Sequence, residues 1–126
     1  MAKKVLIVED DDLNLRLFDA LLSSEGYETV TASSGADALA AVRIEPPDLI
    51  LMDIDLDDAS GFDITACLKR NEAMACVPVL AVPAHAMQGD AKRVKACGCA
   101  GYITKPITMH GFLDAVRQFA QNETMG

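Results

Sequence analysis

Carboxylates gather at two places where an apolar run of the chain ends. Glu9 and Asp10 follow a β-branched run, and Asp53 and Asp55 lie in the stretch LILMDIDLDD. Two chemistries use such a carboxylate: a Mg²⁺-dependent phosphohydrolase with an Asp-x-Asp nucleophile motif, or an aspartate that is itself phosphorylated. Lys105 follows a third apolar stretch, GYIT, and a lysine there could neutralise a phosphoryl oxygen.

These residues need a scaffold, and the chain alternates between strand-like and helix-like segments. Apolar and β-branched runs predict strands over residues 5–8, 28–32, 48–53, 78–82 and 101–104. Capping residues, breakers and apolar periodicity predict helices over about residues 12–25, 34–44, 60–70, 87–97 and around 112–119. In the first helix, Leu13, Leu17 and Leu21 recur every four residues, and Gly26 ends the pattern.

Five strand–helix units in a row predict an α/β fold with a parallel sheet and right-handed crossovers. The expected architecture is a flavodoxin-like (βα)5 doubly wound sheet with the strand order 2-1-3-4-5. Its topological switch point lies between the first and third strands, so Glu9, Asp10 and Asp53 should converge there. Like charges at close range favour a bound cation, and hard oxygen ligands suit Mg²⁺, with Mn²⁺ as a substitute.

The bulk properties exclude several classes of protein. The 126 residues fit one domain, 1–126, with a folded core of about 3–121. A formal net charge of −8 argues against a nucleic-acid partner. No apolar run is long enough for a membrane span or a signal peptide, so we expect a cytoplasmic protein. The spacing of the four cysteines does not match a metal site, and we expect reduced thiols at Cys67, Cys76, Cys97 and Cys99. Cys97 and Cys99 are too close in sequence for a relaxed disulfide between them.

Four pieces of the chain resemble the response-regulator receiver domain, and the similarity covers essentially the whole chain: VLIVEDD with LNLRLF, PDLILMDIDL with SGFD, AMQGDAKRVKACG, and GYITKPI. The resemblance implies that Asp53 is the phosphoacceptor and that Glu9 and Asp10 hold Mg²⁺ together with it. The backbone carbonyl of Asp55 is implied as a further metal ligand, and Lys105 as a contact of the phosphoryl group.

The chain departs from the receiver pattern after the fourth strand. Receivers usually carry Thr or Ser there, whereas this chain has the triplet Val82-Pro83-Ala84. The resemblance implies that Tyr102 swings between outward and inward rotamers, that Ala84 lies near the phosphoryl group, and that the peptide before Pro106 is cis. Pro83 has no hydroxyl and no N–H, so we expect phosphorylation to persist and its coupling to Tyr102 to weaken.

These features predict a stand-alone response regulator of a two-component phosphorelay, similar to regulators of the bacterial cell cycle, without an output domain. Its output would be binding to another protein rather than turnover of a substrate, so it is not expected to be an enzyme. The expected partners are sensor histidine kinases or histidine phosphotransfer proteins, and the expected state is a monomer or weak dimer. Two alternatives are a degenerate receiver that does not switch fully and a small phosphohydrolase, which the short chain disfavours.

Overall fold

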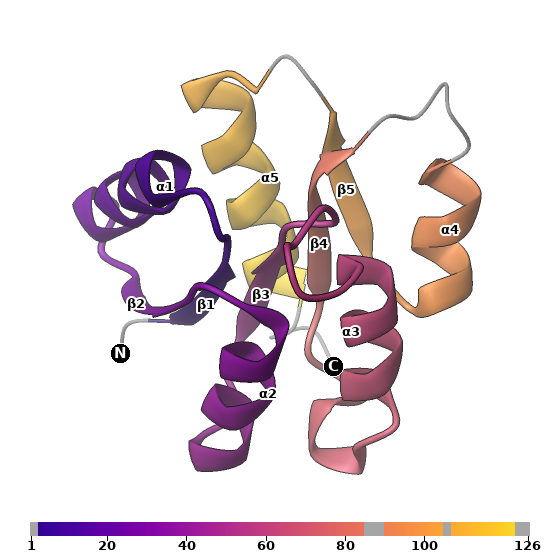
Figure 1. Cartoon of the computed structure of the whole chain (residues 1–126). Helices are drawn as coiled ribbons and strands as arrows, with labels where there is room; N and C mark the ends of the chain where they lie inside the picture. Colours follow the sequence, from indigo (N-terminus) through magenta and orange to yellow (C-terminus); the bar gives the residue numbers. More distant parts are fainter. Residues whose placement is uncertain (1–2, 85–89, 105–106, 123–126) are drawn as a thin grey trace.

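The computed structural model describes residues 3–84, 90–104 and 107–122 of the chain (Figure 1). The strands of this part are β1 (Lys4–Val8), β2 (Glu28–Ala32), β3 (Leu49–Met52), β4 (Val79–Ala84) and β5 (Gly101–Thr104). The helices are α1 (Asp12–Ser24), α2 (Gly35–Ile44), α3 (Gly61–Lys69), the short 3₁₀ helix η1 (Glu72–Met74), α4 (Asp90–Cys97) and α5 (Met109–Asn122). None of these helices is both long and apolar enough to span a bilayer.

The strands form one parallel sheet with the order β2-β1-β3-β4-β5, which confirms the predicted topology. The pairing of β1 with β3 sets Val8 beside Met52, and the pairing of β1 with β2 sets Val8 beside Ala32. The carboxyl ends of three neighbouring strands therefore meet at one edge of the sheet. Glu9 and Asp53 are the residues that come next along β1 and β3.

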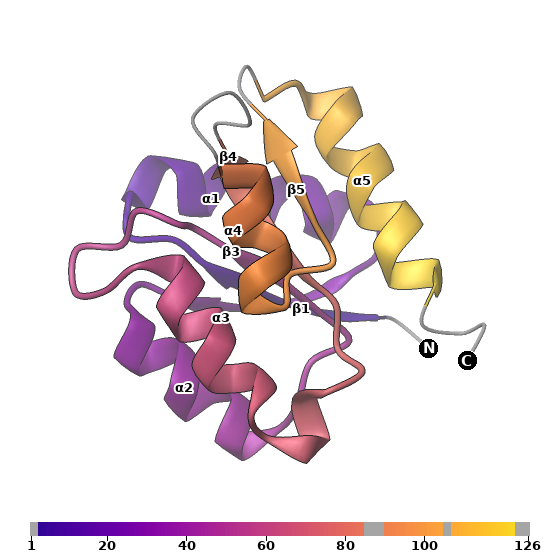
Figure 2. The ribbon, with the colours of Figure 1, turned by 90° about the vertical axis from the view of Figure 1, so that its right-hand side faces the viewer.

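Helices cover both faces of the sheet, which explains why its central strands are continuously apolar. Side chains alternate along β1: Val5 and Ile7 pack with α1 and α5, whereas Leu6 and Val8 pack with α2 and α3. Figure 2 shows α5 on one side of the sheet and α3 and α4 on the other. In the α4 layer, Val94 packs in the buried cluster that contains Ala81 of β4.

Side-chain caps start the first three helices. Asp11 caps α1 by accepting hydrogen bonds from the backbone N–H groups of its first turn. Ser34 caps α2 and Ser60 caps α3 in the same manner. Such caps satisfy N–H groups that would otherwise lack partners, and they fix where each loop at this edge of the sheet becomes helix.

The first two leucines of the repeat in α1 do not lie on the buried face of that helix. Phe18 and Leu22 enter the core, whereas Leu13 is 76% exposed and Leu17 is 52% exposed. Phe18 stacks on Phe112 of α5 with ring centroids 4.7 Å apart, so a contact between two helices sets the rotation of α1. The periodicity predicted the helix but not which of its apolar sides faces the sheet.

β4 runs two residues further than predicted, through Pro83 to Ala84. Its pairing with β5 is irregular there, because Ala81 pairs with Tyr102 while Ala84 pairs with Thr104. Three residue steps on β4 thus match two on β5. A proline has no N–H to donate to a ladder and is tolerated within sheets at such irregularities, which accounts for its place in a central strand.

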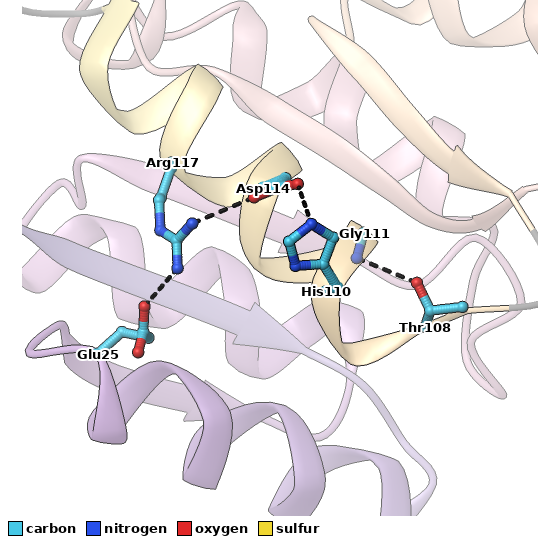
Figure 3. A network of polar contacts seen from close by, with 6 residues as sticks. All are labelled: Glu25, Thr108, His110, Gly111, Asp114 and Arg117. Carbon is cyan, nitrogen blue, oxygen red and sulfur yellow. Dashed lines mark hydrogen bonds and ion pairs between the residues drawn. The ribbon is translucent and has the colours of Figure 1, made fainter.

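A polar network ties α5 to the end of α1 (Figure 3). The Arg117 guanidinium donates to Glu25 at 2.7 Å and to Asp114 at 3.1 Å. His110 lies 3.1 Å from Asp114, one turn along the same helix. These groups are exposed or nearly so, and exposed ion pairs contribute little free energy, so the network adds little to the stability of the fold.

Candidate functional site

Three carboxylates lie at the edge where β1 and β3 end. One carboxylate oxygen from each of Glu9, Asp10 and Asp53 lies within 4.8 Å of the others, which confirms the predicted convergence. Glu9 is 3% exposed and Asp53 is 5% exposed, whereas Asp10 is half-buried. Two buried carboxylates and a third at the mouth fit a hard divalent cation such as Mg²⁺, with Mn²⁺ as an alternative.

The backbone holds Glu9 and Asp53 in position. The Asp53 N–H donates to the Val8 carbonyl at 2.9 Å, and the Glu9 N–H donates to the Ala32 carbonyl at 3.0 Å. These hydrogen bonds continue the sheet by one residue on each strand. The two acidic side chains are therefore anchored to rigid strands and not to free loops.

The crowding of these carboxylates perturbs their protonation. Burial, the charge of Asp53 and a side-chain hydrogen bond with Asp53, in that order, raise the pKa of Glu9 to about 8. Burial also raises the pKa of Asp53, although hydrogen bonds from the Asp55 backbone and from Glu9 act in the opposite direction. Near neutral pH the pair therefore holds a proton, which a divalent cation bound to both groups would displace.

Asn14 is a neighbour of the site that the sequence reasoning missed. Its side-chain amide donates to Glu9 Oε1 at 3.4 Å, and the Asp11 backbone N–H donates to the same oxygen at 3.3 Å. Both donors stabilise the ionised form of Glu9. Asn14 lies in the first turn of α1, two residues after the acidic run ends at Asp12, and this position is the signal that could have identified it.

The loop after β3 folds back onto the carboxylates. The Asp55 N–H donates to Asp53 Oδ1 at 2.9 Å, and the Asp57 N–H donates to Asp10 Oδ2 at 2.7 Å. The Asp55 side chain is exposed, so this residue acts on the site through its backbone. That its carbonyl binds a metal ion stays a prediction.

Gly61 closes this loop against Asp53. Its N–H donates to the Ile54 carbonyl at 3.1 Å. A Cβ atom built on Gly61 would lie 2.1 Å from the carbonyl oxygen of Asp53, a distance that no real contact reaches. Only glycine fits here, because the backbone of the α3 start passes directly beside that of the candidate phosphoacceptor.

Asp58 links the same loop to α2. Its carboxylate accepts from the backbone N–H groups of Gly35 at 2.9 Å and Ala36 at 3.3 Å. The hydrogen bond from Gly35, the larger effect, and the one from Ala36 lower the pKa of Asp58. A carboxylate at a helix N-terminus is also favoured by the helix dipole. The loop after β3 is thus hydrogen-bonded to the acidic cluster and to the N-terminus of α2.

The remaining predicted site residues are described in part or not at all. Lys105 and Pro106 lie outside the described residues, as does the predicted cis peptide between them. The backbone of Pro83 and Ala84 ends β4, but their side chains lie outside the described part of the chain. Tyr102 lies on β5 and is 38% exposed, which leaves its predicted rotamer change untested.

Comparison with known proteins identifies a match over nearly the whole chain. Residues 5–117 match the family model of the response regulator receiver domain. The polar-differentiation response regulator DivK of Brucella ovis is 45% identical over 119 residues, which cover 94% of this chain and 97% of that protein. DivK of Brucella anthropi is 44% identical over the same shares.

Solved structures show the same fold. A CheY-like response regulator receiver domain protein from Methanospirillum hungatei has a TM-score of 0.91 and 25% identity, over 99% of this chain and 98% of that chain. The chemotaxis response regulator CheY4 of Vibrio cholerae has a TM-score of 0.90 and 24% identity, over 94% of this chain and 99% of that chain. The latter similarity concerns the fold alone.

Proposed function

This chain belongs to the response regulator receiver family of two-component signalling, and we propose that its Asp53 accepts a phosphoryl group from phosphohistidine in a Mg²⁺-dependent reaction. The observation that carries the proposal is the convergence of Glu9, Asp10 and Asp53 within 4.8 Å at one edge of the sheet. Phosphoryl transfer depends mostly on positioning the reacting groups and on stabilising charge. The three carboxylates at this edge would hold the metal ion that serves both purposes.

In the proposed transfer an oxygen of Asp53 attacks phosphorus, a P–O bond forms, the P–N bond of phosphohistidine breaks, and the imidazole leaves with a proton from solvent. Asp53 must be ionised to attack, and the hydrogen bond that it accepts from Glu9 favours its ionised form. The hydrogen bond from the Asp55 N–H orients the carboxylate. Glu9, Asp10 and Asp53 would hold Mg²⁺, and the bound ion would supply positive charge to offset that of the phosphoryl oxygens.

Residues beyond the acidic cluster complete the proposal. The backbone carbonyl of Asp55 is a further Mg²⁺ ligand, and Mn²⁺ can replace Mg²⁺. Lys105 and the Ala84 segment contact the phosphoryl group, and Tyr102 reports its presence by changing rotamer. Pro83 supplies no hydroxyl, so the coupling between the phosphoryl group and Tyr102 is weakened. A receiver that is phosphorylated and binds partners without full switching is the alternative.

We also propose that the output is binding to another protein. Similarity to DivK, named a polar-differentiation response regulator, favours a role in cell-cycle or polarity signalling. The proposed partners are a sensor histidine kinase and a histidine phosphotransfer protein. This chain would bind them in the cytoplasm as a monomer or weak dimer. Asp53 would be modified once per molecule and not turn over as an enzyme does.

The test is stoichiometric labelling from a phosphorylated histidine donor. Wild type should incorporate up to one phosphoryl group per chain with Mg²⁺ or Mn²⁺, and none with EDTA. Asp53→Asn should not be labelled. Asp55→Asn is the matched control, because its exposed side chain can change while the backbone N–H to Asp53 remains. Labelling of Asp53→Asn equal to wild type, or labelling unaffected by EDTA, would refute the proposal.

The same experiment separates the receiver from the phosphohydrolase. In an Asp-x-Asp hydrolase the second aspartate is a general acid, so Asp55→Asn would abolish activity, and wild type would turn over a small phosphate ester. We expect no such turnover.

A further inference from the structure

Two thiols lie in contact at the end of α4. The Sγ atoms of Cys97 and Cys99 are 3.3 Å apart. Gly98 between them has φ +97°, a left-handed conformation that a residue with a Cβ rarely adopts. Its N–H donates to the Lys95 carbonyl, and the Cys99 N–H donates to the Val94 carbonyl at 3.0 Å. This is the Schellman pattern, and it turns the chain so that both cysteines face the same side.

The pair packs on a small apolar cluster and is not one of the acidic side chains of the site. Both cysteines are half-buried against residues of the β3 end, α3, β4 and α4: Ile54, Phe62, Ala81 and Val94. The Cys97 thiol donates to the Val94 carbonyl at 3.4 Å, and the Cys99 thiol lies 3.9 Å from the Thr65 hydroxyl. Cys67 and Cys76 are exposed, so the chain contains two kinds of thiol.

We propose that Cys97 and Cys99 are a redox-active dithiol, which a peroxide converts reversibly into an intramolecular disulfide. The thiolate sulfur of Cys97 attacks a peroxide oxygen; an S–O bond forms, the O–O bond breaks, and hydroxide leaves as water after protonation. The Cys99 sulfur then attacks the sulfenic sulfur; the S–S bond forms, the S–O bond breaks, and a second water leaves. The dithiol is oxidised by two electrons and the peroxide is reduced to two waters.

The surroundings assign the order of the two steps. Burial, and then the hydrogen bond and charge of Cys97, raise the pKa of Cys99 to about 12, although the Lys69 ammonium acts in the opposite direction. Cys99 is thus a poor source of thiolate, so we assign the first step to its contact partner Cys97. A sulfenic acid on Cys97 then has the Cys99 sulfur already in contact.

The product should be labile and not a structural staple. A single residue separates the two cysteines, and a bridge between such close neighbours is strained. Strained disulfides have more oxidising potentials and are readily reduced by thiols.

Intact mass spectrometry of the full chain tests the proposal. In the background Cys67→Ser with Cys76→Ser, hydrogen peroxide should remove about 2 Da, and dithiothreitol should restore it. Alkylation after unfolding should show no free thiols before reduction and both after it. The folded background should form this product at least about tenfold faster than the same protein unfolded in urea, because the turn holds the sulfurs together.

Single variants in that background test the order. With Cys99→Ser, a sulfenic acid should persist on Cys97 and be captured by dimedone, whereas Cys97→Ser should give little adduct. Oxidation that adds oxygen without the loss of 2 Da, or bridging at equal rates folded and unfolded, would overturn the proposal. Equal dimedone capture by both single variants would overturn the assigned order. None of these results depends on phosphorylation of Asp53.

Discussion

The proton held by Glu9 makes the stability of the metal-free protein depend on pH. The pKa of Glu9 is raised from 4.5 to about 8, so its contribution is fully present below pH 4.5 and is lost as pH rises through about 8. The pKa of Asp53 is raised in the same direction. In EDTA we therefore expect the melting temperature to fall by several degrees between pH 6 and pH 8.5.

Glu9→Gln is the matched control for this effect, because it keeps the shape of the side chain and removes its titration. Thermal melts of the variant in EDTA should show a clearly smaller dependence on pH. A slope equal to that of wild type would show that another group is responsible. For wild type, bound Mg²⁺ should reverse the trend, since metal binding displaces the proton and its apparent affinity rises with pH up to about 8.

Gly61 should be intolerant of any side chain. Gly61→Ala places a Cβ 2.1 Å from the Asp53 carbonyl oxygen, so the backbone must shift. We expect a loss of about 1–3 kcal/mol in the free energy of unfolding, the range for overpacked sites, and a labelling rate of Asp53 reduced more than about tenfold. Urea unfolding and phosphoryl labelling measure the two effects.

Gly26→Ala separates the two effects of that change. Gly26 has φ +90° with open space around it, so the alanine costs about 1–2 kcal/mol of backbone strain far from the acidic edge. Its labelling rate should stay at the wild-type value. If Gly61→Ala also labels at the wild-type rate, the contact with Asp53 does not matter for the chemistry.

At the scale of elements, β4 and its proline govern the proposed switch. The hydroxyl missing at Pro83 removes a charge-assisted hydrogen bond of roughly 1.5–3 kcal/mol to the phosphoryl group. The population shift on phosphorylation should then be about 10- to 100-fold smaller than with the hydroxyl. We expect beryllofluoride to bind, yet to change the amide NMR shifts of α4 and β5 only slightly. Pro83→Thr should enlarge these changes. Full changes in wild type, with no gain in Pro83→Thr, would contradict this.

The partner surface is a property of the whole molecule. We expect binding through α4, β5 and α5, which follow the strand ends nearest the phosphoryl group. Lys92 and Lys95 of α4 are exposed, and reversing both to Glu should weaken kinase binding at least about tenfold without abolishing Asp53 labelling by a small-molecule donor. Titration calorimetry measures the binding.

A second variant, at the exposed leucines of α1, tests whether the partner binds to a different face. Leu13→Ala with Leu17→Ala removes apolar surface from α1, whose buried residues pack in a different cluster from Val94 of α4, and both side chains are more than half exposed. If this pair abolishes binding while the α4 reversals leave it unchanged, the proposed surface is wrong. Both variants should fold, since neither pair lies in the core.

The sheet and the meeting of its acidic ends follow from signals in the sequence. Alternating apolar runs and caps are local signals, and five strand–helix units leave few right-handed arrangements. In the strand order 2-1-3-4-5, β1 and β3 are adjacent, so the residues directly after them must be neighbours. The sequence therefore predicts that Glu9, Asp10 and Asp53 lie close together, as they do. The receiver resemblance supplied roles that periodicity cannot supply.

The tertiary structure alone decided the contacts made by loops and helix rotations. Phe18 and not Leu17 faces the core because α5 packs against α1. Asp58 reaches the α2 N-terminus, and Cys97 touches Cys99 across the turn at Gly98. Each depends on a backbone path or on side-chain packing between segments. Periodicity records which residues are apolar, but not where a loop folds back or how far a helix turns about its axis.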